Sequence, residues 1–513
     1  MSPDPFSILA NPELLGVELI AMATQCRLDD EGLEKGTRIP FKFRKLLKCK
    51  KGERPSLTRS GQLLVSCIAN RFSGGLPDRF DFSVPNPIFL KKKDHGKGYP
   101  HANLSNADKL GLARAGDAQF LSYWRLIGPV PIHDALVHRV FLAHLRQRID
   151  PLFSDSSHAF RADAGRFSVV SAVRCYEKLA TTHSHIVKLD IVRFFDEIDH
   201  AILGNLCRKM LEQAGFESLE SDKLMNVLEK FMACAPRMLS RGAGATAVSQ
   251  KGVVQGGALS TLLSNIYLHR FDRVMEDNNC RFIRYADDIV IFCQSLEEAN
   301  DRREVAERFL LADLKLRCGE KVLVSEPFHG VDYLGCKFED GRKLIRQKTI
   351  EKFKKKVKRL TRLGQKTKKG SPCKPTYVIQ RVNNQLGFIT GSNSDSGKRK
   401  KCQFRVKYCW ARFIAAHDRE FDGLEEQFRQ IDRLIRYRVR RYWYAFRKRD
   451  VPWNNQLIAR SNRLFSRLGL RTTMEAYRRA RSAMKRRQTE CARHDETESK
   501  GVPAATHPPW QAT

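Results

Sequence analysis

Residues 282–292 read Phe-Ile-Arg-Tyr-Ala-Asp-Asp-Ile-Val-Ile-Phe, two runs of β-branched and aromatic residues with Asp287 and Asp288 between them. This pattern is typical of a buried β-hairpin. Two adjacent carboxylates in an apolar hairpin are costly unless a cation or a proton neutralises them, and a divalent metal is a suitable cation. Metal-assisted phosphoryl transfer would also require a third carboxylate and a surface that binds nucleic acid.

The composition favours a globular protein that binds a polyanion. The chain has 513 residues, enough for roughly three or four domains or subdomains. Lys and Arg number 92 against 57 Asp and Glu, a net charge of +35, while 42% of residues are hydrophobic. A folded protein with this charge is expected to meet nucleic acid, with an anionic membrane as the rival partner.

Targeting signals and cysteine spacing point to a cytoplasmic protein. No apolar run approaches the roughly 18–20 residues that span a bilayer, which predicts no membrane partner, and residues 1–5 lack the basic and apolar regions of a signal peptide. The 14 cysteines include no Cys-x-x-Cys pair and no Cys/His cluster at zinc spacing. We therefore expect reduced thiols and no zinc-dependent nuclease module.

Hydrophobic periodicity predicts a mixed chain of helices and strands. We expect loops over 86–120 and wholly helical structure over 201–234, with the remaining elements in this order: helix 12–23, a strand then a helix within 123–151, strand 186–191, a Gly-rich turn at 251–260 leading to helix 262–275, the hairpin, helix 296–314 and strand 333–338. Antiparallel strands backed by helices make an α+β layer.

Asp190 is the candidate third carboxylate. It ends an apolar strand, so it and Asp287 can be strand-end carboxylates at one edge of a shared sheet. Such a site can hold two divalent ions for in-line displacement at phosphorus. Taken alone, each Asp is better explained as a strand-end turn or a helix cap; the order and flanks of the pieces together favour the metal site.

The basic residues are concentrated in residues 341–450, which contain 33 Lys and Arg against 9 Asp and Glu. Within 435–449, aromatics alternate with arginines, a composition that suits phosphate contact and base stacking. A plain amphipathic helix is the alternative. We favour buried aromatics with phosphate-facing basic residues and predict RNA contacts by Arg436, Arg438, Arg440, Arg441, Lys354, Lys355 and Lys356. A second basic stretch, 41–51, fits a nucleic-acid arm or a solvated helix face equally well, and residues from about 486 onward are expected to be disordered.

Several of these pieces, in this order, resemble a reverse transcriptase over about residues 120–450. They are Asp190 with Phe195, Gln255-Gly256, Tyr285-Ala286-Asp287-Asp288 and Tyr333-Leu334-Gly335. Residues 255–260, followed by Asn265 to Leu268 and Asp272, resemble the bacterial group II intron-type enzymes. The four-residue motif around Asp287 is weak alone, but the ordered set is specific.

The resemblance implies a role for each matching residue. Asp190 and Asp287 would ligate two Mg²⁺ ions, which Mn²⁺ can replace, with the carbonyl of Ile191 assisting and Asp288 completing the catalytic carboxylates. Phe195 would exclude a ribose 2′ hydroxyl. The other nucleotide contacts would come from Gln255, Gly256, Lys321 (protonating pyrophosphate) and Arg125, for which Arg139 is the competitor. Residues 333–335 would form the primer grip.

The resemblance also implies a right-hand polymerase. Its expected parts are an N-terminal extension that could bind RNA (1–85), fingers (86–185), palm (186–340, with part of the fingers inserted near 201–250), a basic helical thumb or maturase-like region (341–485) and a tail (486–513). Its partners would be a structured RNA template, a DNA product and dNTPs, in a bacterial cytoplasm.

The chain departs from the intron enzymes at two places. Ala159 to Arg166 is longer than their usual Gly-Phe-Arg-Pro-Gly-Arg, and Thr261 replaces a proline. The role of the RNA therefore stays open between a retroelement or intron enzyme and an antiphage defence enzyme. A catalytically idle maturase, splicing factor or scaffold is the alternative function, while an RNA-dependent RNA polymerase is disfavoured by Phe195.

Overall fold

A computed structural model of the chain forms two compact units that divide after Ser325. The structure describes residues 4–24, 43, 45–48, 55–73, 81–91, 101, 103–163, 166–240, 250–319, 322–364, 372–390, 422–447, 455–468, 470 and 472–474. The predicted tail and most of the basic stretch at 41–51 lie outside these ranges.

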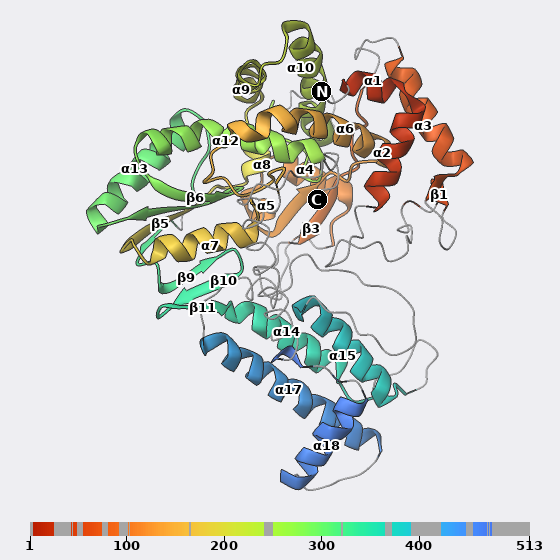
Figure 1. Cartoon of the computed structure of the whole chain (residues 1–513), viewed down its shortest axis with the longest axis vertical. Helices are drawn as coiled ribbons and strands as arrows, with labels where there is room; N and C mark the ends of the chain where they lie inside the picture. The colour runs from red at the N-terminus through yellow and green to blue at the C-terminus, as the bar shows by residue number, and fades with distance from the viewer. Residues whose placement is uncertain are drawn as a thin grey trace, which may run out of the picture. The chain divides into compact units, whose positions relative to one another are not determined.

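The first unit contains a four-stranded sheet in the order β6-β7-β5-β8. Figure 1 labels two of its strands, β5 and β6. The strands of the sheet are β5 (His185–Asp190), β6 (Arg281–Tyr285), β7 (Asp288–Cys293) and β8 (Leu323–Ser325), and neighbouring strands run antiparallel. The predicted hairpin and the strand before Asp190 are thus confirmed. Since β5 pairs with β7, segments nearly a hundred residues apart in sequence meet in the centre of the sheet.

The two faces of this sheet have different surroundings. Val187, Leu189, Ile289 and Ile291 belong to the main apolar core together with residues of α12 (Ala258–Asp277) and α13 (Leu296–Ala312). The alternate positions include Phe292, whose ring meets Tyr176 of α7 (Val169–Ala180) at 5.3 Å between centroids. Side chains alternate between faces along a strand, so the carboxylates of Asp190 and Asp288 lie on the same face as Phe292.

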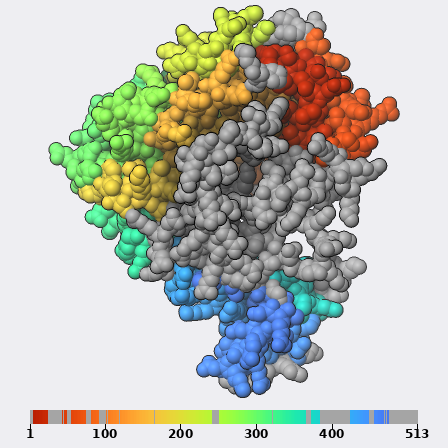
Figure 2. Space-filling model, in the orientation of Figure 1, coloured from red at the N-terminus to blue at the C-terminus, as the bar shows by residue number. Residues whose placement is uncertain are grey.

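Helix α13 shows how the covering helices meet solvent. Ala299, Ala306 and Leu310 are buried in the core, whereas Arg303 pairs with Glu307 four residues later on the outer face. The outer surface of α13 is green in Figure 2. An amphipathic helix with paired surface charges needs only its inner stripe to hold it to the sheet.

The remaining helices of the first unit surround this core. The N-terminal helices α1 (Pro5–Ala10), α2 (Pro12–Thr24) and α3 (Arg59–Phe72) pack together, and α1 and α2 also pack on α6 (Ile132–Ile149). Residues 201–234 are not wholly helical as predicted. They form α9 (His200–Gln213) and α10 (Ser218–Met232) with a turn between them, because Gly215 takes φ 71° and ends the first helix.

The predicted loops over 86–120 are partly wrong. This segment contains β3 (Ile88–Lys91), α4 (Asn106–Arg114) and the start of α5 (Ala118–Tyr123). Strand β3 pairs with β4 (Trp124–Ile127), the strand predicted after Tyr123. Pro and Gly counts obscured α4 and α5, each of which begins with a capping side chain, Ser105 and Asp117 respectively.

The second unit joins a small sheet to a helical bundle. Strands β9 (His329–Tyr333), β10 (Cys336–Glu339) and β11 (Arg342–Ile345) form the sheet. Helices α14 (Gln347–Leu360), α15 (Pro375–Thr390), α17 (Asp422–Phe446) and α18 (Asn455–Arg467) follow. Apolar stripes of these helices share one core, which includes Phe353, Phe428, Ile435 and Phe465. The predicted helical character of this basic region is confirmed. Across the described ranges, no helix is both long and apolar enough to cross a membrane.

Candidate active site

A tight turn places Asp287 and Asp288 at the end of the β6–β7 hairpin. Tyr285 pairs with Asp288, so Ala286 and Asp287 alone form the turn. Ala286 takes φ 58°, as two-residue hairpin turns require at their first position. Glycine is the residue that adopts this conformation without strain, so the alanine costs on the order of 1 kcal/mol. Strained backbone of this kind is common at catalytic sites.

Asp190 faces the hairpin from the neighbouring strand. It is the register partner of Asp288 in the β5–β7 pair, so both side chains project from the same face and edge of the sheet. Just after it, Ile191 forms a bridge with Cys318 through the carbonyl of Asp190 and the amide of Val192. That pattern directs the Ile191 carbonyl away from Cys318. The sequence predicted Asp190 and Asp287 at one edge of a shared sheet. In the structure Asp190 lies opposite Asp288, and Asp287 is the adjacent residue in the turn.

Burial and mutual repulsion make the carboxylates costly to ionise. Burial, followed by repulsion from Asp190 and Asp287, raises the pKa of Asp288 to about 6, although Lys188 opposes the shift. The Lys188 Nζ lies 3.5 Å from Asp288 Oδ1. Burial also raises the pKa of Asp287, with Asp190 adding to the shift and Arg125 opposing it. The charges of neighbouring carboxylates therefore contribute to the raised pKa values of Asp287 and Asp288, as expected for groups that share a site.

These carboxylates fit a divalent metal without forming a finished metal cage. Among the described residues, no three acidic, histidine or cysteine side chains converge closely enough to hold an ion as they stand. Asp190 is exposed and Asp287 is half-buried, so their oxygens can be reached from solvent. Burial and the neighbouring carboxylates raise the pKa values of Asp287 and Asp288, so their ionised forms are unfavourable unless a cation stabilises them. Oxygen ligands are those that Mg²⁺ prefers.

Backbone hydrogen bonds bring Phe195 and Gln255 into one neighbourhood. The Val253 amide donates to the Phe195 carbonyl at 2.8 Å, and the Gly252 amide donates to the Ile198 carbonyl at 2.8 Å. Gly252 has φ 88°, and a Cβ there would meet the Asp196 carbonyl oxygen at 3.1 Å, so the close approach needs glycine. The segment before α12 is thereby fixed against the helix α8 (Phe194–Glu197) that carries Phe195.

Gln255 is held at both its side chain and its backbone. Its Nε2 donates to Asp196 Oδ1 at 3.1 Å, and its carbonyl accepts from the Gly128 amide at 3.1 Å. The next residue, Gly256, is exposed with φ 119°. Phe195 is half-buried beside Phe194, which is fully inside the core.

The structure separates the two arginine candidates. Arg125 on β4 is exposed, and its charge acts on Asp287, which places it in the field of the carboxylates. Arg139 donates instead to Glu18 Oε2 at 2.9 Å, in an ion pair between α6 and α2. Lys321 lies outside the described residues.

Residues 333–335 form the turn of the β9–β10 hairpin in the second unit. Tyr333 pairs with Cys336, and Leu334 and Gly335 both take positive φ, at 42° and 94°. This is the pattern of a two-residue hairpin turn. Tyr333 is buried, whereas Gly335 is exposed.

The predicted RNA-contacting residues divide by exposure. Lys355, Lys356 and Arg441 are exposed, while Lys354, Arg436 and Arg438 are half-buried. Arg440 is different, because it is only 5% exposed and donates to Ser461 Oγ at 2.7 Å and to Asn462 Oδ1 at 2.8 Å on α18. In this structure, Arg440 therefore faces α18 and not solvent, which does not fit a phosphate contact.

Sequence reasoning missed two basic residues of the sheet. Lys188, two positions before Asp190, shares its face and pairs with Asp288, a relation that strand alternation would have revealed. Arg284, in the middle of the apolar strand β6, is wholly buried beside Asp272. Arg284 at a core-facing position of a strand and Asp272 within a core helix are unusual places for charged residues, and this could have predicted a buried ion pair.

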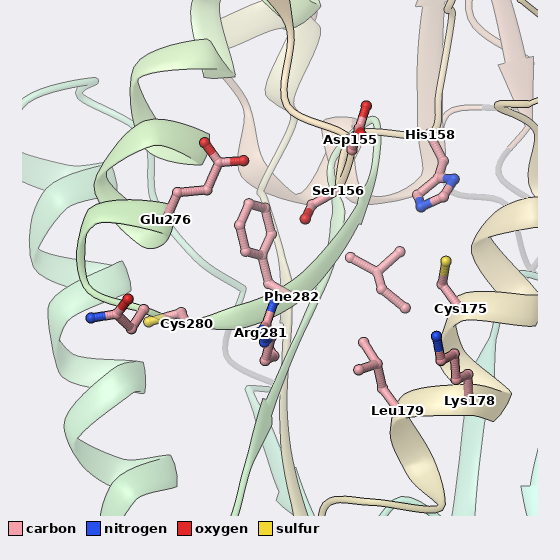
Figure 3. A pocket seen from close by; sticks show the side chains of 12 residues that line it. Asp155, Ser156, His158, Cys175, Lys178, Leu179, Glu276, Cys280, Arg281 and Phe282 are labelled. Atoms are coloured by element: carbon pink, nitrogen blue, oxygen red, sulfur yellow. The ribbon is translucent and has the colours of Figure 1, made fainter.

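A cavity of about 550 Å³ opens at the other end of β6 (Figure 3). Its walls come from α7, the end of α12 and the start of β6, and they include Lys178, Glu276 and Phe282. None of the site residues predicted from the sequence lines it. The cavity is therefore not part of the carboxylate site.

Parts of this chain match known proteins. Residues 114–338 match the reverse transcriptase (RNA-dependent DNA polymerase) family. Protein YkfC of Escherichia coli K12 is 23% identical, over 41% of this chain and 62% of that protein. The group II intron-encoded protein LtrA of Lactococcus lactis is 28% identical, over 31% of this chain and 24% of that protein. The match thus spans less than two thirds of either relative.

Two solved telomerases also show similarity. A Candida albicans telomerase in complex with a fragment of telomeric RNA aligns with a TM-score of 0.36 and 13% identity, covering 70% of this chain and 59% of that one. An apo telomerase of Candida tropicalis aligns with a TM-score of 0.37 and 10% identity, covering 83% and 69%. Residues 114–338, the part of the chain that matches the reverse transcriptase family, contain the carboxylates Asp190, Asp287 and Asp288.

Proposed function

We propose that this protein is an RNA-directed DNA polymerase that adds dNTPs to the 3′ end of a primer on an RNA template. One observation carries the proposal: the β5–β7 register sets Asp190 opposite Asp288 beside the Asp287 turn, so three carboxylate residues lie at one edge of a sheet. The family match supports the reaction class. The raised pKa values of Asp287 and Asp288 supply the electrostatic reason to bind cations.

The carboxylates would hold two Mg²⁺ ions, with Mn²⁺ as a substitute. Asp190, Asp287 and the Ile191 carbonyl are the proposed ligands, and Asp288 completes the acidic cluster beside Lys188. When bound, such ions lower the pKa of an attacking hydroxyl and stabilise charge on a leaving oxygen. The primer 3′ oxygen attacks the α-phosphorus and loses its proton, and the bond to the β-phosphate oxygen breaks to release pyrophosphate.

The nucleotide would lie between α8 and the segment before α12. Phe195 is half-buried, so part of its ring is available to meet a ribose 2′ hydroxyl. Gln255, fixed by Asp196 and Gly128, and the exposed Gly256 would border the nascent pair. Arg125 would contact the triphosphate, since its charge already acts on Asp287. Lys321 is proposed on the family resemblance alone as the acid for pyrophosphate.

We further propose a right-hand organisation within the mixed α+β architecture. The fingers would comprise residues 86–185 with the insertion near 201–250, and the palm residues 186–340 including the primer grip at 333–335. The thumb or maturase-like region would comprise residues 341–485. Residues 1–85 would form an N-terminal extension. The exposed basic residues of α14 and α17, such as Lys355 and Arg441, would contact the backbone of the RNA-containing duplex.

The biological role is proposed at a coarser level. A dedicated structured RNA, of a bacterial retroelement or an antiphage defence system, would serve as template. The alternative function is an RNA-binding maturase, splicing factor or scaffold without polymerase activity. The intact set of Asp190, Asp287 and Asp288 favours the polymerase. Sequencing RNA that co-purifies with the protein would identify the template.

Primer extension tests the proposal directly. Purified protein is incubated with a primed RNA, Mg²⁺ and either dNTPs or NTPs, beside an Asp287→Ala variant whose fold and RNA binding are checked. We expect incorporation of dNTPs by the wild type and none by the variant. Incorporation of NTPs alone would indicate an RNA-dependent RNA polymerase, and no incorporation of either would leave the RNA-binding alternative. Equal activity of the variant would reject the proposed carboxylate site.

Phe195 provides a sharper second measurement on the same assay. Phe195→Ala should admit ribonucleotides because it removes the ring that meets the 2′ hydroxyl, whereas Phe195→Tyr keeps the bulk and should retain the preference for dNTPs. The ratio of dNTP to NTP incorporation is measured for both variants. An unchanged ratio in Phe195→Ala would show that another residue selects the sugar.

A further inference from the structure

Arg284 is an arginine buried completely inside the first unit. Both it and Asp272 have side chains that are 0% exposed. Its guanidinium donates from Nε to Asp272 Oδ1 at 2.7 Å and from Nη2 to Asp272 Oδ2 at 2.5 Å, a two-pronged contact between β6 and α12. Paired geometry of this kind fixes the plane of the guanidinium as well as its position.

The third nitrogen of Arg284 points to the catalytic turn. Nη1 donates to the carbonyl of Ala286 at 3.3 Å and to Asn265 Oδ1 at 3.2 Å. Ala286 is the residue with φ 58° immediately before Asp287. The Arg284 side chain therefore holds the peptide group that leads into Asp287, from the side of the sheet opposite the carboxylates.

The backbone of Arg284 is fixed as well. Its amide donates to the Ser156 carbonyl at 2.8 Å, and its carbonyl accepts from the His158 amide at 2.9 Å. Figure 3 shows Ser156 and His158 on the segment that runs beside β6. The Asn265 Nδ2 donates to the Ala159 carbonyl at 2.8 Å, so one residue of α12 braces both this segment and Arg284.

Stability alone does not account for such a pair. The desolvation of two buried charges offsets most of their attraction, and well-packed apolar residues in their place are often equally or more stable. What an apolar pair cannot do is donate a directed hydrogen bond to the Ala286 carbonyl. The contact to the turn is thus the feature of this pair that apolar residues of similar volume would not reproduce.

We propose that Arg284, oriented by Asp272 and Asn265, is a positioning residue that sets the backbone of the Ala286–Asp287 turn and thereby the direction of the Asp287 carboxylate. This inference rests on the proposed polymerase function. A catalytic group displaced by about 1 Å can lose roughly a hundredfold in rate. Loss of Arg284 should therefore lower kcat and weaken metal binding while leaving RNA affinity intact.

The test compares two variants with a control pair. Arg284→Lys keeps the charge but lacks the planar, two-pronged contact with Asp272 that orients the donor toward the Ala286 carbonyl. Arg284→Met combined with Asp272→Leu removes both buried charges at similar volume. Arg303→Met with Glu307→Gln is the control, because it removes an ion pair of the same unit that does not touch the turn.

Five quantities are measured for each protein: thermal unfolding, RNA affinity, kcat and KM for dNTP in primer extension, and Mn²⁺ affinity by paramagnetic resonance titration. For the double variant, we expect a folded protein, unchanged RNA affinity, kcat lowered about a hundredfold with little change in KM, and weaker Mn²⁺ binding. Arg284→Lys should lower kcat by about tenfold, and the control pair should leave kcat unchanged.

Wild-type kcat and Mn²⁺ affinity in either folded variant would overturn the proposal. If the double variant does not fold, Arg284→Lys decides alone by the same two readouts. If the wild type incorporates no dNTP, the proposed function fails, while Mn²⁺ titration of wild type and Arg284→Lys still decides whether Arg284 positions the acidic turn.

Discussion

The β6–β7 hairpin and helix α14 both carry several charged side chains, but these side chains differ in their exposure to solvent. In the hairpin, Arg284 is fully buried against Asp272, and Asp288 is half-buried against Lys188. In α14, the charges lie on an exposed face, with Lys352, Lys355 and Lys356 open to solvent. The effect of a buried charge depends on its contacts with a few fixed partners. Exposed charges are screened by solvent, and their effect comes from the total charge of the surface.

This difference predicts what each region does when a single charge is removed. In the hairpin, one substitution should abolish a specific step and leave the affinity for RNA alone. In α14, one substitution should change affinity slightly and leave the chemical step alone. Helix α17 lies between these cases, because Arg441 is exposed while Arg440 is buried.

The largest effect is expected for Asp190→Asn. The amide keeps the shape but removes a charge that faces Asp288 across the β5–β7 pair, so the proposed two-metal site would lose a ligand. Primer extension should fall by roughly a thousandfold or more, equivalent to about 4 kcal/mol, with RNA affinity unchanged in a filter-binding assay. A parallel loss of RNA affinity would break the contrast between the two regions.

Arg440→Met should lower the free energy of unfolding by about 2–3 kcal/mol, because Ser461 Oγ and Asn462 Oδ1 lose a buried donor. Chemical denaturation measures the change. Arg441→Met, at the exposed neighbouring position, is the control and should stay within about 0.5 kcal/mol. If instead Arg440→Met weakens RNA binding and leaves stability intact, the original RNA-contact prediction for Arg440 stands.

Acidification should destabilise the first unit through buried histidines. Burial lowers the pKa of His138 to about 3, between the rings of Phe82 and Phe231. Because the folded pKa is below the unfolded value of about 6.5, the stabilising contribution is complete above pH 6.5 and is lost as the pH falls toward 3. Between pH 7 and pH 5, we expect a loss on the order of 1–2 kcal/mol from this residue.

His138→Phe is the matched variant for that pH dependence. It keeps an aromatic ring in the same space and removes the titrating group, so unfolding measured from pH 7 to pH 5 should depend less on pH than in the wild type. Burial also lowers the pKa values of His158 and His269, each to about 4, so part of the slope should persist. An identical slope in the variant would show that His138 is not buried as described.

The smallest effect is expected for Lys355→Ala on α14. One exposed lysine contributes one phosphate contact at most, so RNA affinity should fall by less than about tenfold and the slope of log affinity against log salt by about 1. Arg303→Ala on α13, an exposed charge already paired with Glu307, serves as the control with no change. A hundredfold loss in Lys355→Ala would mean that this lysine has a specific partner.

Sequence patterns predicted the elements whose periodicity is strong. Strand β5, the hairpin and the helices after it follow from apolar alternation and length. The sequence predicted that Asp190 and Asp287 share a sheet edge but not that Asp190 pairs with Asp288, because register depends on contacts between distant segments. Helices α4 and α5 were missed because their caps lie among Pro- and Gly-rich residues.

The predicted site was less complete than the predicted fold. The carboxylates could be named from the sequence, but the direction of a side chain on a basic helix could not, which is why Arg440 was placed with its exposed neighbours. Arg284 escaped notice because its role depends on a hydrogen bond to the Ala286 carbonyl. Such a contact depends on how β6 packs against α12, and no hydrophobic periodicity in the sequence predicts it.

The β5–β7 pairing has a consequence for how the protein is made. Asp190 and Asp288 meet only after nearly a hundred intervening residues, including helices α9, α10 and α12, have been synthesised. Closing so long a loop makes this contact slow compared with the local helices. On the ribosome, the catalytic edge cannot assemble until β7 has left the exit tunnel. Until then, β5 is an apolar strand without its central partner, which a nascent chain must keep from pairing with other chains.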